Sequence, residues 1–415
     1  MATIAVLGTL DTKGFEHRFV ADCIAQHGHD VLLIDVGTGE APQVQPHLSR
    51  QTVAEMAGLD LSSIEKDRGK AMDLMSQAAP KVLCKLRESG KIQAVISLGG
   101  GGGTAIGTAG MRALPLGFPK LMVSTLASGN TAQYIGTTDI VMMPSVVDVA
   151  GLNRISRPVL ARAAGAICGM LEAAQKDRPD EDRPLILASM FGNTTIGVES
   201  ARRLLEGAGY EVLVFHATGT GGRSMEALIA SGVAAGVLDF TTTEWADEIV
   251  GGVLSAGPSR LEAAAKSGTP AIFAPGCLDM VNFFARETVP TKFNERTLHI
   301  HNPQVTLMRT NAEEAAAIGK AVAEKLNAST GPLTVLLPIK GVSAISSPGF
   351  LFHDPTADTA LFRAIHRTLR KDIPVIEVDA TVNDPSFAAA CAQALLENIA
   401  KAAQASNLPA VRSKR

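Results

Sequence analysis

The feature that most limits the fold is a run of five glycines, Gly99 to Gly103, directly after the apolar segment Ile92–Leu98. Glycine loses more conformational freedom on folding than other residues, so five in succession are costly to order. One or two would be enough for a flexible turn. Between a buried strand and a helix, such a run lets the backbone approach a ligand closely and direct its N–H groups at it.

Short apolar segments alternate with helical patterns along the whole chain, which predicts βαβ units and parallel sheets. Only 4% of the residues are aromatic, so aliphatic residues must fill the interior. Continuous aliphatic strands are typical of parallel sheets covered by helices. The expected strands are Thr3–Leu7, Val31–Asp35, Ile92–Leu98, Leu121–Thr125, Ile140–Met143, Leu185–Met190, Glu211–Phe215, Gly236–Phe240, Ala271–Ala274, Val335–Leu337 and Pro374–Val378.

A charged segment with two prolines, Gln175–Pro184, lacks apolar periodicity and is the best candidate for a linker. We therefore expect an α/β protein of two Rossmann-like, doubly wound parallel-sheet lobes with a cleft between them. The lobes would span residues 1–178 and 184–405, followed by a flexible tail, 406–415. Both lobes open with a strand, a helix and a second strand, which indicates either an internal duplication or the general form of such units.

Charge and composition exclude several classes of protein. The net charge is −3 and no basic stripe with stacking aromatics is visible, so nucleic acid is not an expected partner. The sequence lacks an apolar run of about 18 residues, so we expect no membrane span. Five widely separated cysteines indicate a reducing compartment, and the first residues lack the basic region of a signal peptide. We expect a cytoplasmic protein.

The segment after the first expected strand carries phosphate-binding groups just before a helix. Gly8, Thr9 and Thr12 offer backbone amides and hydroxyls. Lys13 would neutralise a phosphate, and Asp11 would hold Mg²⁺ or accept from a ligand hydroxyl. Ligands of open α/β sheets bind beyond the carboxyl ends of the strands, and helix N-termini favour anions. The alternative is a capped helix start with solvated charges.

The glycine run itself is the strongest candidate for a phosphate cradle, with Thr104 at the start of the following helix as a second Mg²⁺ ligand. It is neither a Walker A motif nor a strict GxGxxG, so nicotinamide dinucleotides are not favoured. Two further segments, one after the expected strand Leu121–Thr125 and one at the end of the expected strand Val31–Asp35, would complete the site. The alternatives are an ordinary turn and an ordinary strand end. The full set of predicted ligand-binding residues is Gly8, Thr9, Asp11, Thr12, Lys13, Asp35, Gly99, Gly100, Gly101, Gly102, Gly103, Thr104, Thr125, Ser128, Gly129 and Asn130.

Polar residues in the second lobe suggest a substrate pocket. Asp279 follows an expected strand, and an extended segment would place His299 and His301 on one face. These three are candidate acid–base or substrate-orienting groups. With Cys277 they could also form a metal site by residue type, although the spacing matches no metal signature. A buried cysteine and hydrogen-bonded strand histidines are the simpler interpretation.

Several motifs together resemble one family. They are Gly8–Lys13, Gly99–Thr104, Ser124–Asn130 and Pro275–Phe283, and the resemblance runs from residue 1 to about residue 405. The family is the uncharacterised bacterial and fungal one related to the N-terminal inhibitory region of the tomato mosaic virus resistance protein. The resemblance implies an ATP site in the first lobe, at Asp11–Lys13 and Gly100–Thr104, two Rossmann-like lobes, and self-association as a dimer. Any activity of the plant protein's additional C-terminal domain does not transfer.

We therefore expect an ATP-binding protein that uses Mg²⁺, with room for a second small-molecule substrate between the lobes and no membrane partner. Whether it is an enzyme stays open. One alternative is a non-catalytic nucleotide sensor or interaction module. Another is an enzyme that acts on a phosphorylated metabolite without ATP, because glycine-rich loops recognise phosphate better than adenine.

Overall fold

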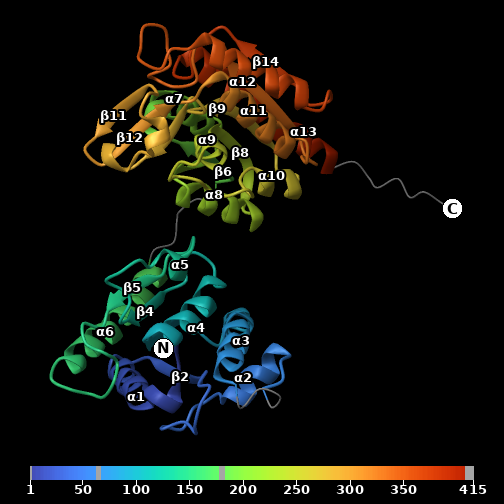
Figure 1. Ribbon diagram of the computed structural model, residues 1–415. Helices are drawn as coiled ribbons and strands as arrows, with labels where there is room; N and C mark the ends of the chain where they lie inside the picture. Colours follow the sequence, from blue (N-terminus) through green and yellow to red (C-terminus); the bar gives the residue numbers. More distant parts are fainter. Residues whose placement is uncertain (1, 62–66, 177–182, 407–415) are drawn as a thin grey trace. The chain divides into compact units, whose positions relative to one another are not determined.

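The computed structural model describes residues 2–61, 67–176 and 183–406. It divides into two compact units, Met1–Asp180 and Glu181–Arg415, which are described separately below (Figure 1). Each unit is an α/β sandwich built on a parallel sheet, as the alternation of apolar segments and helices predicts.

The first unit holds a five-stranded sheet in the order β2-β1-β3-β4-β5, with every neighbouring pair parallel. Its elements are β1 (Thr3–Gly8), α1 (Leu10–Gln26), β2 (Asp30–Asp35), α2 (Arg50–Ala57), α3 (Arg68–Glu88), β3 (Ala94–Gly99), α4 (Gly101–Arg112), β4 (Lys120–Ser124), α5 (Ala132–Ile135), β5 (Val141–Pro144) and α6 (Ser156–Lys176).

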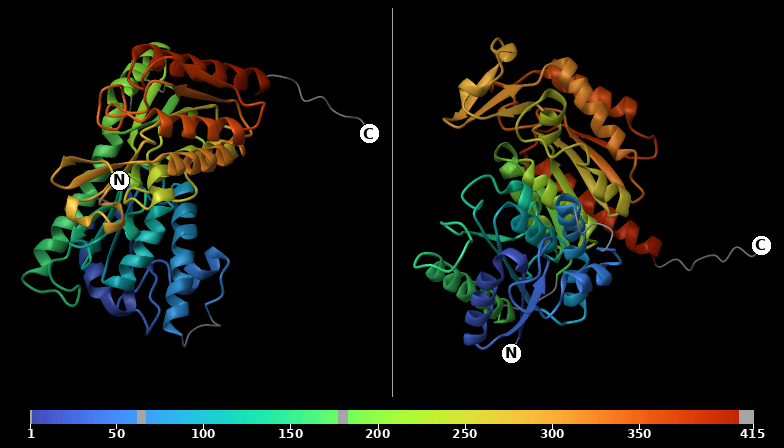
Figure 2. Two further views of the ribbon diagram at one scale, coloured as in Figure 1. Left: turned by 45° about the horizontal axis from the view of Figure 1, so that its top comes forward. Right: turned by 60° about the horizontal axis from the view of Figure 1, so that its bottom comes forward.

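Helices cover both faces of this sheet because its central strands are apolar on both sides (Figure 2). Ala5 and Leu7 of β1 pack with the core under α2, α3 and α4. Ile4 and Val6 point to the opposite face and pack with α1 and α6. A strand buried on both faces reads as a continuous apolar run, and this is why β1 could be located from sequence.

The second unit holds a six-stranded parallel sheet in the order β14-β13-β9-β8-β6-β7 and a three-stranded antiparallel sheet in the order β10-β12-β11. Its elements are β6 (Leu185–Met190), η1 (Gly192–Thr194), α7 (Thr195–Gly207), β7 (Glu211–His216), α8 (Thr220–Ala230), β8 (Ala234–Thr241), α9 (Glu244–Val250), α10 (Glu262–Ser267), β9 (Ala271–Gly276), β10 (Met280–Phe283), η2 (Arg286–Thr288), η3 (Thr291–Phe293), β11 (Leu298–Asn302), β12 (Val305–Arg309), α11 (Ala312–Leu326), β13 (Leu333–Pro338), α12 (Pro355–Thr368), β14 (Val375–Val378) and α13 (Pro385–Ser406).

The large sheet of the second unit is also covered on both faces. Leu187, Val237 and Phe273 pack with α8, α11 and α12, whereas Ile186 and Leu238 point to the side of α7 and α13. The strands β10 and β12 were not predicted from the sequence. Both are short, and they pair with each other across more than twenty intervening residues.

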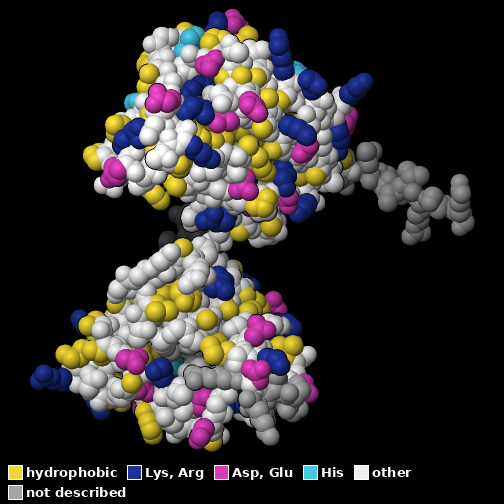
Figure 3. Space-filling model, in the orientation of Figure 1, with side chains coloured by type: hydrophobic (Ala, Val, Ile, Leu, Met, Phe, Trp, Pro, Cys, Tyr) yellow, Lys and Arg dark blue, Asp and Glu magenta, His cyan; other side chains and the backbone are white. Residues whose placement is uncertain are grey.

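Acidic and basic side chains are intermingled on the visible face of each unit, so the described residues form no continuous basic stripe on this face (Figure 3). Of the helices within the described ranges, none has the length and apolar character needed to span a bilayer.

Candidate functional site

The strand order of the first sheet reverses at β1 and β3. From β1 the chain moves to one edge, β2, and then returns to the other side of β1 to add β3, β4 and β5. At such a switch point, the segments after the two strands separate and leave a crevice where ligands of doubly wound folds bind. Here those segments are the starts of α1 and α4.

A cavity of about 410 Å³ lies at this switch point. Its walls come from the starts of α1 and α4, the segment after β2, α3 and the segment before α6. The lining residues are Thr9, Asp11, Thr12, Lys13, Thr38, Gly39, Glu40, Met72, Gly100, Gly101, Gly102, Gly103, Ile106 and Asp148. The structure therefore brings together two of the predicted segments, which lie about ninety residues apart in the chain.

The glycine run is the first turn of a helix, which differs from the loop that the sequence analysis described. Gly100 is the N-cap of α4, and Gly101, Gly102 and Gly103 follow it in helical conformation. The first amides of a helix have no intrahelical acceptor. Within the described ranges, the amides of these three glycines find no other acceptor either. They are free donors at the wall of the cavity, and the helix dipole adds partial positive charge there.

Glycine is needed at some of these positions for space and at others leaves space open. A Cβ on Gly102 would lie 2.6 Å from Cε of Met72, and one on Gly99 would lie 2.8 Å from Cα of Gly103. A Cβ on Gly101 would meet no atom within 4 Å. Gly101 is therefore the position where a side chain would enter the cavity without disturbing the packing around it.

The Asp11 side chain lines the cavity and is held by the segment after β2. Its Oδ2 accepts hydrogen bonds from the amides of Thr38, at 3.1 Å, and Gly39, at 2.7 Å. Its Oδ1 is buried and has no hydrogen-bond partner in the described part of the chain. A buried carboxylate oxygen without a donor is costly, so a cation or ligand hydroxyl that reached this atom would be stabilising.

Lys13 lines the cavity but is held by the protein. Its ammonium donates to the carbonyl of Val149 and lies 4.0 Å from a carboxylate oxygen of Asp148. Its backbone is non-helical within α1, which begins at Leu10, inside the segment that was expected to precede the helix. The described part of the cavity lining thus carries three carboxylates, on Asp11, Glu40 and Asp148, against one ammonium.

His17 lies beneath the first segment, and sequence reasoning missed it. A Cβ on Gly8 would lie 1.9 Å from Nε2 of His17, so only glycine fits at the end of β1. The ring is buried, and this desolvation lowers its pKa. Its Nδ1 bonds the carbonyl of Lys13 at 2.6 Å. The imidazole supports the kinked start of α1 from inside, and a close approach of this kind leaves no signal in the sequence.

Two predicted residues are buried in structural roles. The Asp35 carboxylate accepts from the amides of Leu10 and Gly37 and from Nε of Arg50, at 2.9 Å. The Thr104 hydroxyl is buried, bonds the hydroxyl of Ser124 at 2.7 Å and donates to the carbonyl of Gly99. Neither side chain lines the cavity at the starts of α1 and α4.

The predicted residues after β4 lie in an exposed turn. Thr125, Ser128, Gly129 and Asn130 are all exposed, and none lines this cavity. The amide of Thr125 donates to the carbonyl of Gly99, which connects this turn to the end of β3. The turn is therefore adjacent to the glycine run without forming part of the cavity wall.

In the second unit, Asp279 and the two histidines do not form one group. Asp279 is buried, and this desolvation raises its pKa to about 6; its Oδ2 accepts from the hydroxyl of Ser343 at 2.8 Å. His299 and His301 lie on β11 with ring centroids 6.2 Å apart, and His299 meets the ring of Phe352 edge-on. Among the described residues, no hydrogen bond joins Asp279 to either histidine.

The described residues contain no group of three or more His, Cys, Asp or Glu side chains arranged to hold a metal ion. A cation at the first-unit cavity would therefore take few protein ligands. Mg²⁺ is commonly held in this way, through one or two carboxylates, waters and the phosphates of a substrate. The unpartnered Oδ1 of Asp11 fits that requirement.

Fold and site together define a protein of two Rossmann-like α/β units with a polar cavity at the switch point of the first. The chain belongs to the uncharacterised protein family UPF0261. The N-terminal domain of that family matches residues 2–176, and its C-terminal domain matches residues 183–399.

Relatives occur in bacteria and in a plant. The UPF0261 protein of Clostridium tetani is 48% identical over 401 residues, which cover 96% of this chain and 99% of the relative. The ToMV resistance protein Tm-1(GCR237) of Solanum lycopersicum is 38% identical over 94% of this chain but only 55% of its own length. Among solved structures, a UDP-N-acetylglucosamine 2-epimerase from Rickettsia bellii aligns over 98% of this chain and 97% of its own, at 11% identity and a TM-score of 0.23. That similarity is too low to inform function.

Proposed function

We propose that the first unit binds the phosphate chain of a nucleoside triphosphate, ATP, together with Mg²⁺, in the cavity at the starts of α1 and α4. The observation that carries the proposal is the convergence of three free backbone amides, on Gly101–Gly103, and the Asp11 carboxylate on one cavity of about 410 Å³; the buried Oδ1 of that carboxylate has no partner among the described residues. Free amides at a helix N-terminus suit phosphate oxygens, and a lone carboxylate oxygen suits the accompanying cation.

The charge of the cavity supports a metal–phosphate complex over a bare phosphate. Three carboxylates face one ammonium that is already held by Val149 and Asp148. A free polyphosphate would be repelled by this excess of negative charge. Bound Mg²⁺ neutralises phosphate charge and links the phosphates to a carboxylate. In this arrangement Asp11 would hold the cation, and the amides of Gly101–Gly103 would bind the phosphate oxygens.

The choice of ATP rests on the family resemblance that the motifs carry. A specific observation keeps a second candidate. Among the described residues that line the cavity, none has an aromatic side chain that would stack on a base. A protein that binds a smaller phosphorylated metabolite with Mg²⁺ would use the same groups. Binding of inorganic triphosphate with Mg²⁺ as tightly as ATP would favour that second candidate.

Isothermal titration of the full-length protein with ATP–Mg²⁺ tests the proposal. Gly101→Val would place a side chain in the cavity where a Cβ meets nothing within 4 Å, so we expect affinity to fall at least about tenfold in a folded protein. Lys13→Ala should weaken binding less. The matched control is Gly169→Val, on the exposed surface of α6, where a Cβ also meets nothing. Equal affinity in all four proteins would remove this cavity from consideration.

A further inference from the structure

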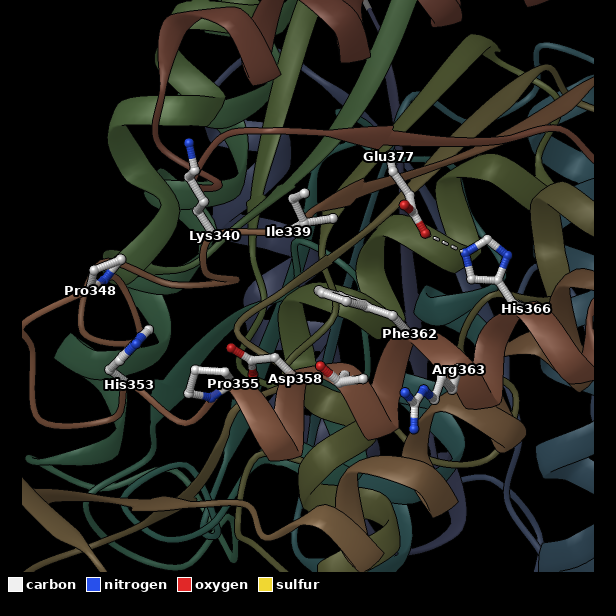
Figure 4. Close-up of a pocket in the computed structure, with 11 residues that line it drawn as sticks. Ile339, Lys340, Pro348, His353, Pro355, Asp358, Phe362, Arg363, His366 and Glu377 are labelled. Carbon is white, nitrogen blue, oxygen red and sulfur yellow. Dashed lines mark hydrogen bonds and ion pairs between the residues drawn. The ribbon is translucent and has the colours of Figure 1, made fainter.

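A second cavity, of about 410 Å³, lies within the second unit beside α12 (Figure 4). Its walls come from the segment after β13, the segment that leads into α12, α12 itself and β14. This volume lies in the range of small-molecule sites. The lining residues are Ile339, Lys340, Pro348, His353, Pro355, Asp358, Thr359, Phe362, Arg363, His366 and Glu377.

One face of α12 forms the floor of this cavity. Asp358, Phe362 and His366 follow one another at intervals of four residues, so they line one face along about 12 Å of helix. The adjacent face is packed in the core through Leu361 and Ile365, and Phe362 belongs to both faces. The floor is therefore attached to a rigid element, as a preformed site requires.

The positive charges around the cavity are not equivalent. Lys340 pairs with Asp379 at 2.9 Å, and His366 pairs with Glu377 at 2.9 Å. Arg363 is exposed and forms no hydrogen bond or ion pair in the described part of the chain. The cavity thus offers one guanidinium that is not neutralised by the protein. Guanidinium groups match carboxylates with two parallel hydrogen bonds.

Two acceptors face the same cavity. Asp358 is buried, and Nη2 of Arg309 donates to its Oδ1 at 2.6 Å; within the described ranges its Oδ2 has no donor. Nδ1 of His353 lies 3.1 Å from the carbonyl of Ser346. That carbonyl can only accept, so Nδ1 carries the proton and Nε2 of the neutral ring is an acceptor. A ligand in this cavity therefore needs hydrogen-bond donors as well as one negative charge.

We propose that this cavity binds a small organic carboxylate that also carries a hydroxyl or ammonium group. The carboxylate pairs with Arg363, and the hydroxyl or ammonium donates to Asp358 or His353. The apolar body of the ligand lies on Phe362 and Ile339. Because one guanidinium is uncommitted among the described lining residues, a single negative charge fits better than the two of a phosphate monoester. This site is independent of the nucleotide site, since all of its residues lie in the second unit.

Ligand-observed NMR titration of the full-length protein, without nucleotide, tests the proposal. The probes are 3-phenyllactate, leucine and 2-hydroxyisocaproate, each beside its methyl ester, with phenyl phosphate as the doubly charged comparison. We expect at least one acid to bind and its ester to bind at least tenfold more weakly. Arg363→Gln should weaken the acid at least tenfold. Arg367→Gln is the matched control, because Arg367 is exposed on α12 outside the cavity lining, and it should change nothing.

A second variant tests the location. Thr359→Trp would fill the cavity from the exposed floor of α12 and should abolish binding. The proposal is overturned if none of the acids binds, if Arg363→Gln binds the acids as tightly as the natural protein, or if phenyl phosphate binds more tightly than every acid. Failure of ATP to bind the first unit would leave these results unaffected.

Discussion

The two units share a strand order but differ at the point where that order reverses. The first sheet runs β2-β1-β3-β4-β5, and the second runs β7-β6-β8-β9-β13-β14. In the first unit the amides at the start of α4 are free and face a cavity. In the second, the corresponding helix after β8 is α9, and its first residue, Glu244, fills the crevice: its carboxylate accepts from the amides of Gly219, at 2.9 Å, and Gly222, at 3.1 Å, at the start of α8, and pairs with Nε of Arg260.

In the second unit, the buried ion pair of Glu244 and Arg260 therefore occupies the crevice at the switch point. Glu244 and Arg260 are both 1% exposed. A Cβ on Gly222 would lie 2.3 Å from a Glu244 carboxylate oxygen, whereas one on Gly101 of the first unit meets nothing. The comparison teaches that topology provides the crevice, and that side chains decide whether it receives a ligand or becomes core.

The largest expected effect comes from removing the guanidinium that neutralises the second switch point. Arg260 bonds Asp239, Glu244 and Glu226. Arg260→Met leaves buried carboxylates unpaired, which we expect to lower the free energy of unfolding by about 3–5 kcal/mol. Urea denaturation followed by fluorescence measures this, because the single tryptophan, Trp245, is buried in this unit.

The control for this variant is Arg202→Met. Arg202 forms half-exposed pairs with Glu199 and Glu206 on α7, and such pairs contribute about 0–1 kcal/mol. If the two variants lost similar stability, the filled switch point would not be the buried ion cluster that the comparison describes.

A second prediction concerns the pH dependence of the second unit. Burial raises the pKa of Asp247 to about 7, although Asn282 donates to it. The folded state therefore holds the proton more tightly than the unfolded state, so stability falls as pH rises from about 4 to about 7 and is constant above. We expect a loss of roughly 2–4 kcal/mol from this group.

Asp247→Asn is the variant that isolates this effect, because it keeps the shape of the side chain and removes the titration. Its free energy of unfolding, followed by Trp245 fluorescence at pH 5 and pH 8, should change less with pH than that of the natural protein. An identical pH dependence in both would show that Asp247 ionises normally in the folded state.

Gly222 at the start of α8 and Gly101 at the start of α4 give a direct test of a filled against an open crevice. Gly222→Ala forces a Cβ against Glu244 and should cost about 1–3 kcal/mol. Gly101→Ala meets nothing and should change stability by less than about 1 kcal/mol. Calorimetric unfolding of both variants measures the difference. Equal destabilisation would mean that the first crevice is packed as tightly as the second.

The smallest expected effects separate two predicted Mg²⁺ ligands. Asp11→Asn should reduce the gain in ATP affinity that Mg²⁺ provides by about tenfold, because Oδ1 would no longer carry charge. Thr104→Val should lower stability by about 1 kcal/mol through its lost bond to Ser124 and leave the Mg²⁺ dependence unchanged. Titrations with and without Mg²⁺ check both. A loss of Mg²⁺ dependence in Thr104→Val alone would reverse the assignment.

Much of the fold could be predicted because buried parallel strands leave a plain signal. Leu185–Met190 was expected with the same bounds that β6 has, and β1 differs by one residue. The start of α1 was missed because Thr12, Gly14 and the non-helical Lys13 do not read as helix. The short strands β10 and β12 depend on pairing between distant segments, which a local pattern does not record.

The candidate site was predictable only where the residue type itself indicates exposed backbone amides. Five glycines after an apolar run point to exposed amides wherever the chain folds. Asp148 lines the same cavity but comes from a segment far along the chain. His17, a buried residue of α1, lies against Gly8 next to the cavity wall. Neither position could be read from the local sequence. Likewise, Asp358 and Arg363 look like the solvated face of an ordinary helix until β13 and β14 are placed above them.

The most direct test of the central claim is amide NMR of the protein labelled with ¹⁵N-glycine, recorded before and after addition of excess ATP–Mg²⁺. The chain has 39 glycines, so both switch points are observed in one spectrum. The account predicts that the amides of Gly101, Gly102 and Gly103 shift most, while those of Gly219 and Gly222 stay in place. Unmoved Gly101–Gly103 signals at saturating nucleotide, or larger shifts at Gly219 and Gly222, would contradict it.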